Sequence, residues 1–166
     1  SLTEGYVVEK KYAYPALIGD ALKKKGHKVK IINGGVSGST TASGHSRLMW
    51  FLKAKPDVLF LALGANDGLR GQSVKNLKAN LDKIIILAKE KKLKVILAQM
   101  LLPPNYGKKY TESFKQLYRD LAKKHEITLV PFLLQGVAGN KKLNIEDGIH
   151  PNQKGYEKIR DNILKY

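Results

Sequence analysis

Short apolar runs alternate with longer amphipathic segments along this chain, and this alternation limits the folds that it can adopt. Residues 58–64 are almost entirely apolar, which is typical of a strand buried on both faces of a sheet. Strands that alternate with helices are joined by right-handed crossovers, so the sheet is expected to be parallel and covered by helices on both faces. Strands are predicted for residues 29–33, 58–64, 94–98 and 128–132.

The amphipathic segments are predicted to be helices. Pro15 stands in the first turn of one segment, and Gly26 ends it. Residues 73–92 carry apolar side chains at steps of three and four, which is typical of a helix that packs one face on a core. The predicted helices are residues 15–25, 43–54, 73–92, 110–124 and 153–164.

The composition supports one domain and excludes several kinds of chemistry. Of the 166 residues 43% are hydrophobic, so residues 1–166 are predicted to form a single domain with its own core. The chain has no cysteine, which excludes disulfide scaffolds, thiolate zinc sites and cysteine nucleophiles. Because the chain lacks cysteine, its nucleophile must be an oxygen atom. Its apolar runs are far shorter than the roughly 20 residues that a membrane span requires.

The chain is strongly basic. Its net charge of +16 comes from 30 lysine and arginine residues against 14 aspartate and glutamate residues. Most lysines cluster near the ends of predicted helices, where cations complement the helix dipole and face water. This pattern favours a solvated basic surface, with attraction to anionic lipid as the alternative. No zinc-finger spacing or RNA-binding strand signature accompanies the charge, so no nucleic-acid partner is expected.

Asp147 and His150 lie close together near the end of the chain. A carboxylate at this spacing can hydrogen-bond to one imidazole nitrogen and leave the other ready to take a proton from a serine. The alternative is structural, with Asp147 in a turn that caps the last predicted helix. The other histidines, His27, His45 and His125, have no acidic partner at short spacing and are interpreted as surface or packing residues. No cluster has the spacing of metal ligands, so a hydrolase without metal or cofactor is expected.

Three polar or glycine-rich segments follow the predicted strands. They are residues 34–39, 64–68 and 102–106. In open parallel sheets the active site lies beyond the carboxyl ends of the strands. These segments are therefore expected to converge on one rim.

Four separated blocks resemble the SGNH, or GDSL, hydrolases, and the chain is most similar to their bacterial thioesterase I/lysophospholipase branch. The blocks are SLTEGY at residues 1–6, the turn at Gly38, GAND at residues 64–67 and DGIHPN at residues 147–152. The resemblance covers nearly the whole chain. It implies a flavodoxin-like, three-layer α/β/α sandwich around a central parallel sheet.

The resemblance also implies roles for individual residues. Ser1 corresponds to the nucleophile, His150 to the general base and then acid, and Asp147 to the group that orients His150. The backbone N–H groups of Ser1 and Gly38 and the side-chain amide of Asn66 correspond to the oxyanion hole. Gly38 as a turn glycine and Asn66 as a loop residue are the structural alternatives.

The same family branch implies a substrate with an acyl chain. Leu102, Pro103, Tyr106 and Ile149 are expected to contact that chain, the alternative for residues 101–107 being a proline-stiffened loop that packs on its own domain. The predicted function is hydrolysis of carboxylic esters or thioesters, namely acyl esters, acyl-CoA thioesters or lysophospholipids, through an acyl-serine intermediate. Two alternatives are a carbohydrate O-acetylesterase and a basic protein that binds nucleic acid or membrane on an inactive scaffold. A monomer is expected, and the resemblance implies a periplasmic or secreted location.

The chain departs from the family pattern before Ser1. Family members place a buried central strand ending in Gly-Asp directly before the serine, and no residue precedes Ser1 here. We expect the natural protein to carry that strand between residues 29–33 and 58–64. Without it, these two segments would leave backbone donors and acceptors unpaired.

Overall fold

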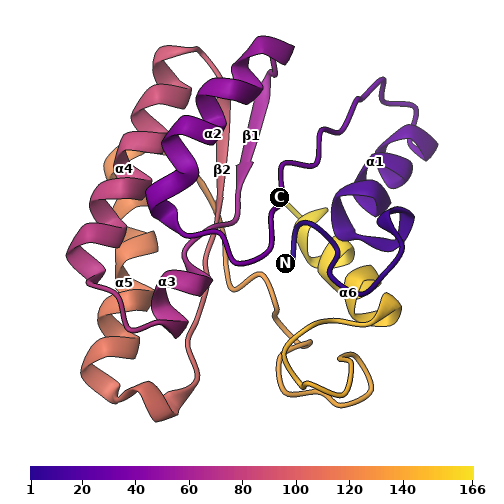
Figure 1. The fold of residues 1–166 in the computed structure, drawn as a ribbon. Coiled ribbons are helices and arrows are strands. Elements are labelled where there is room, and N and C mark those ends of the chain that lie inside the picture. The colour runs from indigo at the N-terminus through magenta and orange to yellow at the C-terminus, as the bar shows by residue number, and fades with distance from the viewer. The chain divides into compact units, whose positions relative to one another are not determined.

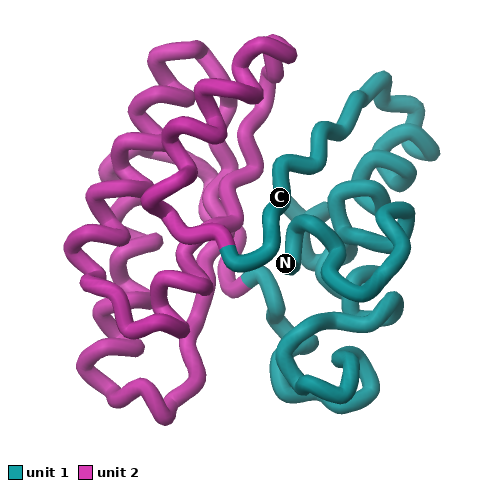
Figure 2. The backbone as a smooth tube through the Cα atoms, viewed as in Figure 1, with its two compact units in different colours: residues 1–38, 133–166 teal, residues 39–132 magenta.

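A computed structural model describes residues 1–166 (Figure 1). The chain divides into two compact units (Figure 2). Unit 1 comprises Ser1–Gly38 and Leu133–Tyr166, and unit 2 comprises Ser39–Phe132. No helix is long and apolar enough to cross a membrane.

Unit 2 contains a parallel sheet, as predicted. Its strands are β1 (Val58–Leu61), β2 (Lys94–Ala98) and β3 (Thr128–Val130), in the order β1-β2-β3. Phe60 pairs with Ile96, and Leu97 pairs with Leu129. The central strand β2 is the most deeply buried, and Leu97 is fully inaccessible to solvent. β1 lies at an edge and has only β2 as a neighbour.

Unit 2 also contains four α-helices. They are α2 (Gly44–Phe51), α3 (Ala65–Leu69), α4 (Val74–Glu90) and α5 (Lys108–His125). Of these, α4 and α5 contact the strands. In Figure 1, α4 and α5 lie beside the strands and α2 packs on α4. The predicted apolar stripe of α4 forms the core, with Leu77, Leu81, Ile84 and Ile85 at most 1% exposed.

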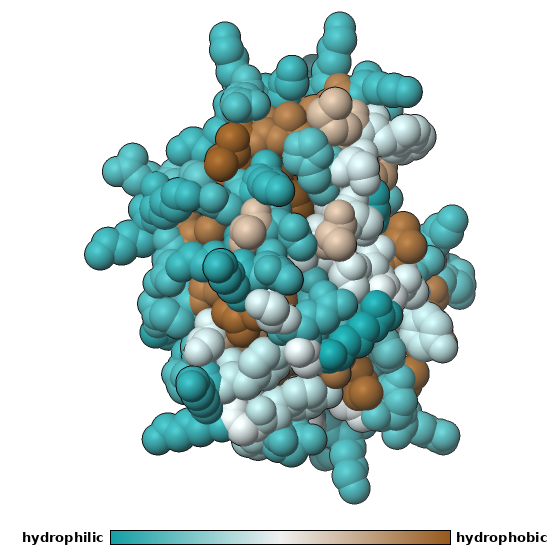
Figure 3. Space-filling model, turned by 60° about the vertical axis from the view of Figure 1, so that its left-hand side comes forward, coloured by the Kyte–Doolittle hydropathy of each residue, from teal (hydrophilic) through white to brown (hydrophobic).

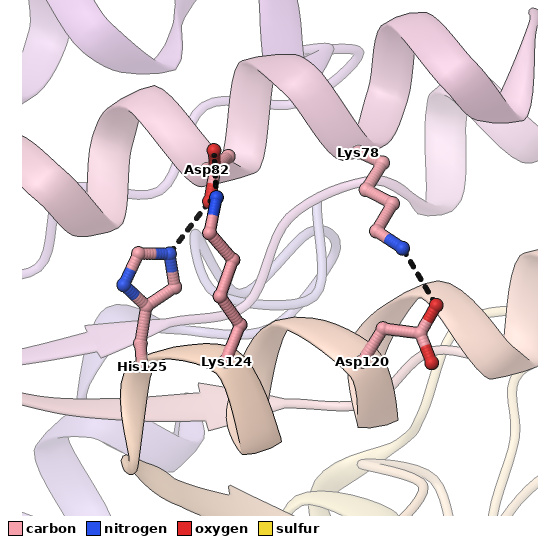
Figure 4. A network of polar contacts seen from close by, with 5 residues as sticks. All are labelled: Lys78, Asp82, Asp120, Lys124 and His125. Carbon is pink, nitrogen blue, oxygen red and sulfur yellow. Dashed lines mark hydrogen bonds and ion pairs between the residues drawn. The ribbon is translucent and has the colours of Figure 1, made fainter.

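Polar contacts join α4 to α5 (Figure 4). Lys78 Nζ lies 2.6 Å from Asp120 Oδ2. Asp82 lies 2.7 Å from Lys124 Nζ and 2.6 Å from His125 Nε2. His125 is buried, which agrees with its interpretation as a packing residue, and its acidic partner lies 43 positions away, on the neighbouring helix.

Unit 1 is built around two helices that pack on each other, α1 (Tyr14–Lys24) and α6 (Gln153–Ile163). Tyr14 and Tyr156 are buried in this unit. Gly19 brings α1 close to the following segment, since a Cβ atom there would lie 2.8 Å from Ile31 Cγ1.

The prediction of a strand at residues 29–33 is wrong. This segment has no regular hydrogen-bonding partner, and unit 1 contains no strand with which it could pair. Ile31 and Ile32 remain 41% and 42% exposed. An extended segment becomes a strand only when a neighbour satisfies its backbone groups, so local sequence did not decide the outcome here.

Residues 64–68, predicted as a loop, contain the short helix α3. The helix follows Gly64, whose φ of 115° is left-handed. A side chain at Gly64 would also collide with Tyr118, because a Cβ atom there would overlap the tyrosine hydroxyl oxygen. Glycine is thus required both for the turn and for the close approach of α5.

Candidate active site

Ser1, Asp147 and His150 come together within unit 1. His150 Nδ1 lies 2.6 Å from Asp147 Oδ2, and His150 Nε2 lies 3.0 Å from Ser1 Oγ. With the proton on Nδ1, the imidazole donates to the carboxylate and leaves Nε2 to accept the serine O–H. The His150 side chain is 19% exposed, so the pair is reachable from solvent. The contact joins residues 149 positions apart.

Asp147 is held by the backbone that follows it. Its Oδ1 accepts hydrogen bonds from the N–H groups of Ile149 at 2.8 Å and His150 at 2.9 Å. The backbone N–H of His150 is the main cause that lowers the pKa of Asp147 to about 2, the imidazole and the Ile149 N–H add to it, and desolvation partly opposes them. The carboxylate therefore stays ionised at every pH at which such an imidazole could act as a base.

The loop that carries Asp147 and His150 is closed by its own hydrogen bonds. Ile145 N–H donates to His150 O at 2.9 Å, and Gly148, at a φ of 68°, donates to Ile145 O at 3.0 Å. α6 begins just after this loop, and its N-cap is Asn152, whose side chain accepts from the Gly155 N–H. The structural alternative for Asp147, a cap of this helix, is therefore wrong.

A tight turn holds Ser1. Its carbonyl oxygen accepts from the N–H groups of Gly5 at 2.9 Å and Tyr6 at 3.1 Å. The Tyr6 ring lies 4.7 Å from the His150 ring, centroid to centroid, and covers one side of the imidazole. Ser1 and the base are thus fixed by the same short segment.

The loop before Gly38 is tied to this segment by two polar side chains. Asn33 Nδ2 donates to Thr3 O at 2.7 Å. Glu4 accepts from the Ser37 N–H at 2.7 Å and also from the Ser37 hydroxyl. These hydrogen bonds lower the pKa of Glu4. Gly38 follows directly, with a left-handed φ of 74°. Sequence reasoning missed the contact of Glu4, since no periodicity or motif role marks it.

Asn66 belongs to unit 2, in the first turn of α3. Its Nδ2 donates to Ser39 O at 2.9 Å. The neighbouring Asp67 is 1% exposed and accepts from both the N–H and the hydroxyl of Thr41. Asp67 therefore fixes the α3 turn to the segment before α2, and Asn66 is presented by a rigid support.

The segments that follow β1 and β2 meet within unit 2, as expected of loops on one rim. A Cβ atom on Gly68 would lie 2.6 Å from Leu102 Cδ2. Tyr106 donates its hydroxyl hydrogen bond to Leu69 O at 2.9 Å. Pro103 is exposed, and Ile149 of unit 1 is 57% exposed. Their predicted role in substrate binding stays a prediction.

No group of three or more histidine, aspartate or glutamate side chains is arranged to hold a metal ion. The hydrogen-bonded serine, histidine and aspartate are the chemically distinctive feature of unit 1. Such a chain of contacts is the arrangement that activates a serine hydroxyl.

The sequence relationship agrees with this geometry. The model of the GDSL-like lipase/acylhydrolase family matches residues 1–158. The chain belongs to this family. The predicted resemblance and the prediction of a hydrolase are thereby confirmed.

Relatives of this family member share most of its length. The arylesterase of Vibrio mimicus is 41% identical over 166 residues, which cover 99% of this chain and 83% of the arylesterase. The thioesterase 1/protease 1/lysophospholipase L1 of Escherichia coli strain K12 is 36% identical over 99% of this chain and 78% of its own length. The crystal structure of TesA superposes with a TM-score of 0.95 at 34% identity and covers 99% of this chain and 92% of TesA. The predicted fold class is confirmed by this match and by the parallel sheet with its flanking helices.

Proposed function

We propose that this GDSL-family hydrolase cleaves carboxylic ester and thioester bonds of acyl substrates, and that Ser1 carries the acyl group between two half-reactions. The observation that supports the proposal best is the hydrogen-bonded series from Ser1 Oγ through His150 to Asp147. Relatives named arylesterase and thioesterase/lysophospholipase support the substrate class.

In the first half-reaction, Ser1 Oγ attacks the carbonyl carbon while His150 Nε2 takes the hydroxyl proton. Asp147 stabilises the imidazolium, which then gives the proton to the leaving alcohol or thiol. In the second, a water molecule attacks the acyl-serine, again with His150 as base. Splitting the hydrolysis in this way replaces one difficult step by two easier ones.

We further propose that the N–H groups of Ser1 and Gly38 and the amide of Asn66 stabilise the tetrahedral oxyanion, as the family resemblance implies. A donor of this kind is typically worth about 3 kcal/mol in the transition state. Asn66→Ala is therefore expected to lower kcat by about a hundredfold or more with little change in KM. A rise in KM alone would contradict this assignment.

A fluorophosphonate that reacts only with activated serines tests the nucleophile. Intact-protein mass spectrometry and peptide mapping are expected to find one adduct, on Ser1. Ser1→Ala and His150→Ala should be unlabelled and inactive, while Ser46→Ala, which removes an exposed serine of α2, should be labelled normally. Circular dichroism would verify that all three variants are folded. An unlabelled, inactive wild-type protein would favour a binding function instead.

A series of acyl substrates tests the substrate class. Nitrophenyl esters from acetyl to octanoyl, an acyl-CoA and a lysophospholipid are the probes. We expect turnover of the longer acyl chains, to which Leu102, Pro103, Tyr106 and Ile149 are proposed to contribute. Activity confined to acetyl esters would instead indicate an O-acetylesterase. We also propose a monomer without a nucleic-acid partner, and light scattering in solution would measure its mass.

A further inference from the structure

The two turns that lead into β1 and β2 lie next to each other at one end of unit 2 (Figure 1). The backbone joins them, since Lys94 N–H donates to Asp57 O at 2.9 Å. Between the turns is a hollow of about 430 Å³. Three of its lining residues are lysines, namely Lys55, Lys91 and Lys92. Asp57 is the only acidic side chain in the lining, so the hollow is positively charged.

Apolar side chains are exposed beside this hollow, at the end of α2. Trp50 is 62% exposed and Met49 is 50% exposed. The Trp50 ring packs edge-on against Phe51, with 4.9 Å between centroids, and the next residue, Leu52, lines the hollow. At the upper end of the face in Figure 3, apolar surface likewise lies between hydrophilic side chains. An exposed apolar patch rimmed by polar side chains is typical of an interaction site.

Uncompensated positive charge surrounds these apolar residues. Residues 50–57 and 90–94 contain the lysines at positions 53, 55, 91, 92 and 94, against the acids at positions 57 and 90. No ion pair involves any of these lysines; the cross-helix pairs of unit 2 use Lys78 and Lys124 instead. The lysines thus remain available to an external anion.

Two of the lysines occupy positions that glycine would fill more easily. Lys55 has a φ of 49° and Lys92 a φ of 61°, both left-handed. Such positions at helix ends usually carry glycine or asparagine. At both positions the chain has a lysine instead, and both lysines line the hollow. They also offer clean variants, because asparagine tolerates the same backbone conformation.

We propose that this basic aromatic end, made of Met49, Trp50, Lys55, Lys91 and Lys92, binds the surface of an anionic phospholipid membrane. The lysines would neutralise lipid phosphates, while Trp50 and Met49 enter the interfacial layer. Tryptophan favours that layer because its ring is apolar and its N–H remains hydrated. Lysines near an anionic bilayer add attraction that salt screens.

This attachment does not depend on hydrolysis. The hollow lies where β1 and β2 begin, whereas Asn66 and Leu102 lie in the segments that follow these strands. Binding at the first edge therefore leaves the second edge of unit 2 open to substrate. Membrane binding and turnover of a water-soluble ester are expected to be separable by substitution.

Trp50 is the only tryptophan of the chain, so its fluorescence reports on this surface directly. The protein would be titrated with phosphatidylcholine vesicles and with vesicles of equal parts phosphatidylcholine and phosphatidylglycerol. We expect a shift of emission to shorter wavelength, and quenching by brominated acyl chains, only with the anionic vesicles. Added sodium chloride should reverse both effects. Binding detected by co-sedimentation without any change in Trp50 emission would overturn the proposal.

Matched charge variants separate a local site from general basicity. Each lysine near an anionic bilayer contributes roughly a fivefold gain in binding, so Lys55→Asn with Lys92→Asn should weaken vesicle binding roughly 25-fold. Lys24→Asn with Lys25→Asn removes the same charge from exposed lysines at the end of α1 in unit 1 and should change binding far less. Equal losses in the two pairs would overturn the proposal. Trp50→Ala, measured by co-sedimentation, should also weaken binding.

Further outcomes identify other occupants and keep the two proposals apart. Tighter, Lys55-dependent binding of single-stranded DNA than of vesicles would indicate nucleic acid. A blue-shifted Trp50 without vesicles that depends on protein concentration would indicate a second copy of the chain. Either outcome overturns the membrane proposal. All these variants should keep normal kcat/KM on a soluble ester, whereas vesicle binding by a wild type without esterase activity would contradict only the proposed function.

Discussion

Asp147 combines two tasks in one side chain. One carboxylate oxygen accepts the backbone N–H groups of Ile149 and His150, which shapes the loop. The other accepts from the imidazole, which fixes the tautomer. Because different oxygens perform these tasks, they can be separated by substitution.

Asp147→Asn should preserve the conformation of the loop but abolish most of the catalytic activity. The amide oxygen can still accept from Ile149 and His150, but the NH₂ group would donate to Nδ1 and force the proton onto Nε2. In that tautomer the imidazole cannot accept from Ser1, and losses of about 10³–10⁴ in kcat are typical. Steady-state kinetics at neutral pH, with circular dichroism as the control for folding, would measure this. A loss below about tenfold would show that Asp147 does not set the tautomer.

The low pKa of Asp147 also predicts a pH dependence of stability. The pKa is about 2 in the folded chain against 3.8 as its ordinary value, so the folded state binds fewer protons between these values. The contribution is complete above about pH 4 and is lost as pH falls towards 2. Urea unfolding of wild type and Asp147→Asn should therefore converge at low pH. Parallel curves from pH 2 to 6 would contradict the assignment.

Glu4 is expected to be a positioning residue. It holds the Ser37 N–H and hydroxyl directly before Gly38, so its loss should loosen the loop that presents the Gly38 N–H. Glu4→Ala should lower kcat about tenfold or more with little change in KM, because hydrogen bonds to a charged acceptor are worth about 1.5–3 kcal/mol. Glu4→Gln can still accept one of the bonds and should recover part of the rate.

Ser37→Ala is the control for this prediction, since it removes only the hydroxyl contact. Its kcat should lie between those of wild type and Glu4→Ala. A change confined to KM would place Glu4 in substrate binding. A fall in thermal stability with unchanged kcat would make its role purely structural.

At the scale of elements, the contacts between α4 and α5 differ in burial and hence in value. The side chains of Lys78 and Asp120 are 42% and 41% exposed, whereas Asp82 and His125 are 23% and 9% exposed. Burial raises the pKa of Asp82, but hydrogen bonds from Lys124 and His125 outweigh this and leave the pKa below its ordinary value. We therefore expect the Asp82 cluster to stabilise the helix pair more than the exposed ion pair does.

Asp82→Asn should lower the free energy of unfolding by about 1–3 kcal/mol, because it weakens charge-assisted hydrogen bonds in a half-buried site. Asp120→Asn should cost less than about 1 kcal/mol, as is usual for an exposed pair. Urea unfolding at neutral pH compares the two. The difference should shrink below about pH 4, where the Asp82 contribution is progressively lost. Equal losses would show that burial does not distinguish the two contacts.

These elements also show how much of the fold could be predicted from the sequence. The apolar stripe of α4 repeats within the segment itself, so its helix and its buried face could be predicted. The prediction of a strand at residues 29–33 was wrong, because a strand forms only where a neighbouring strand can pair with it. α3 required the left-handed Gly64 and its contact with Tyr118, and the pairing of Asp82 with His125 required two helices to meet.

The candidate site divides in the same way. Ser1, Asp147 and His150 lie in short sequence blocks whose residue types indicate a nucleophile, an acid and a base. Their contact in the folded chain could therefore be predicted. Glu4 reaches Ser37 across 33 positions, and neither residue type implies the other. Contacts that support a reacting group are set by the folded backbone, and a single sequence carries little signal for them.

At the scale of the whole molecule, like charges oppose one another. The chain has 30 lysine and arginine residues but only 14 aspartate and glutamate residues, and few of the cations form ion pairs. At low ionic strength these cations repel one another over distances of about 30 Å, and at 0.15 M salt over about 8 Å. The folded chain concentrates the charge, so the repulsion opposes folding.

Sodium chloride should therefore stabilise this protein, although it weakens individual ion pairs. The exposed pairs contribute little each, so relief of repulsion among the excess cations is expected to dominate. Raising salt from about 0.01 to 0.15 M should increase the free energy of unfolding by about 1 kcal/mol, or about 2–4 °C in Tm. Calorimetry in sodium chloride and in choline chloride would test this, since screening depends on ionic strength and not on the cation. A lower Tm at higher salt would show that local ion pairs such as Asp82 with Lys124 outweigh the net charge.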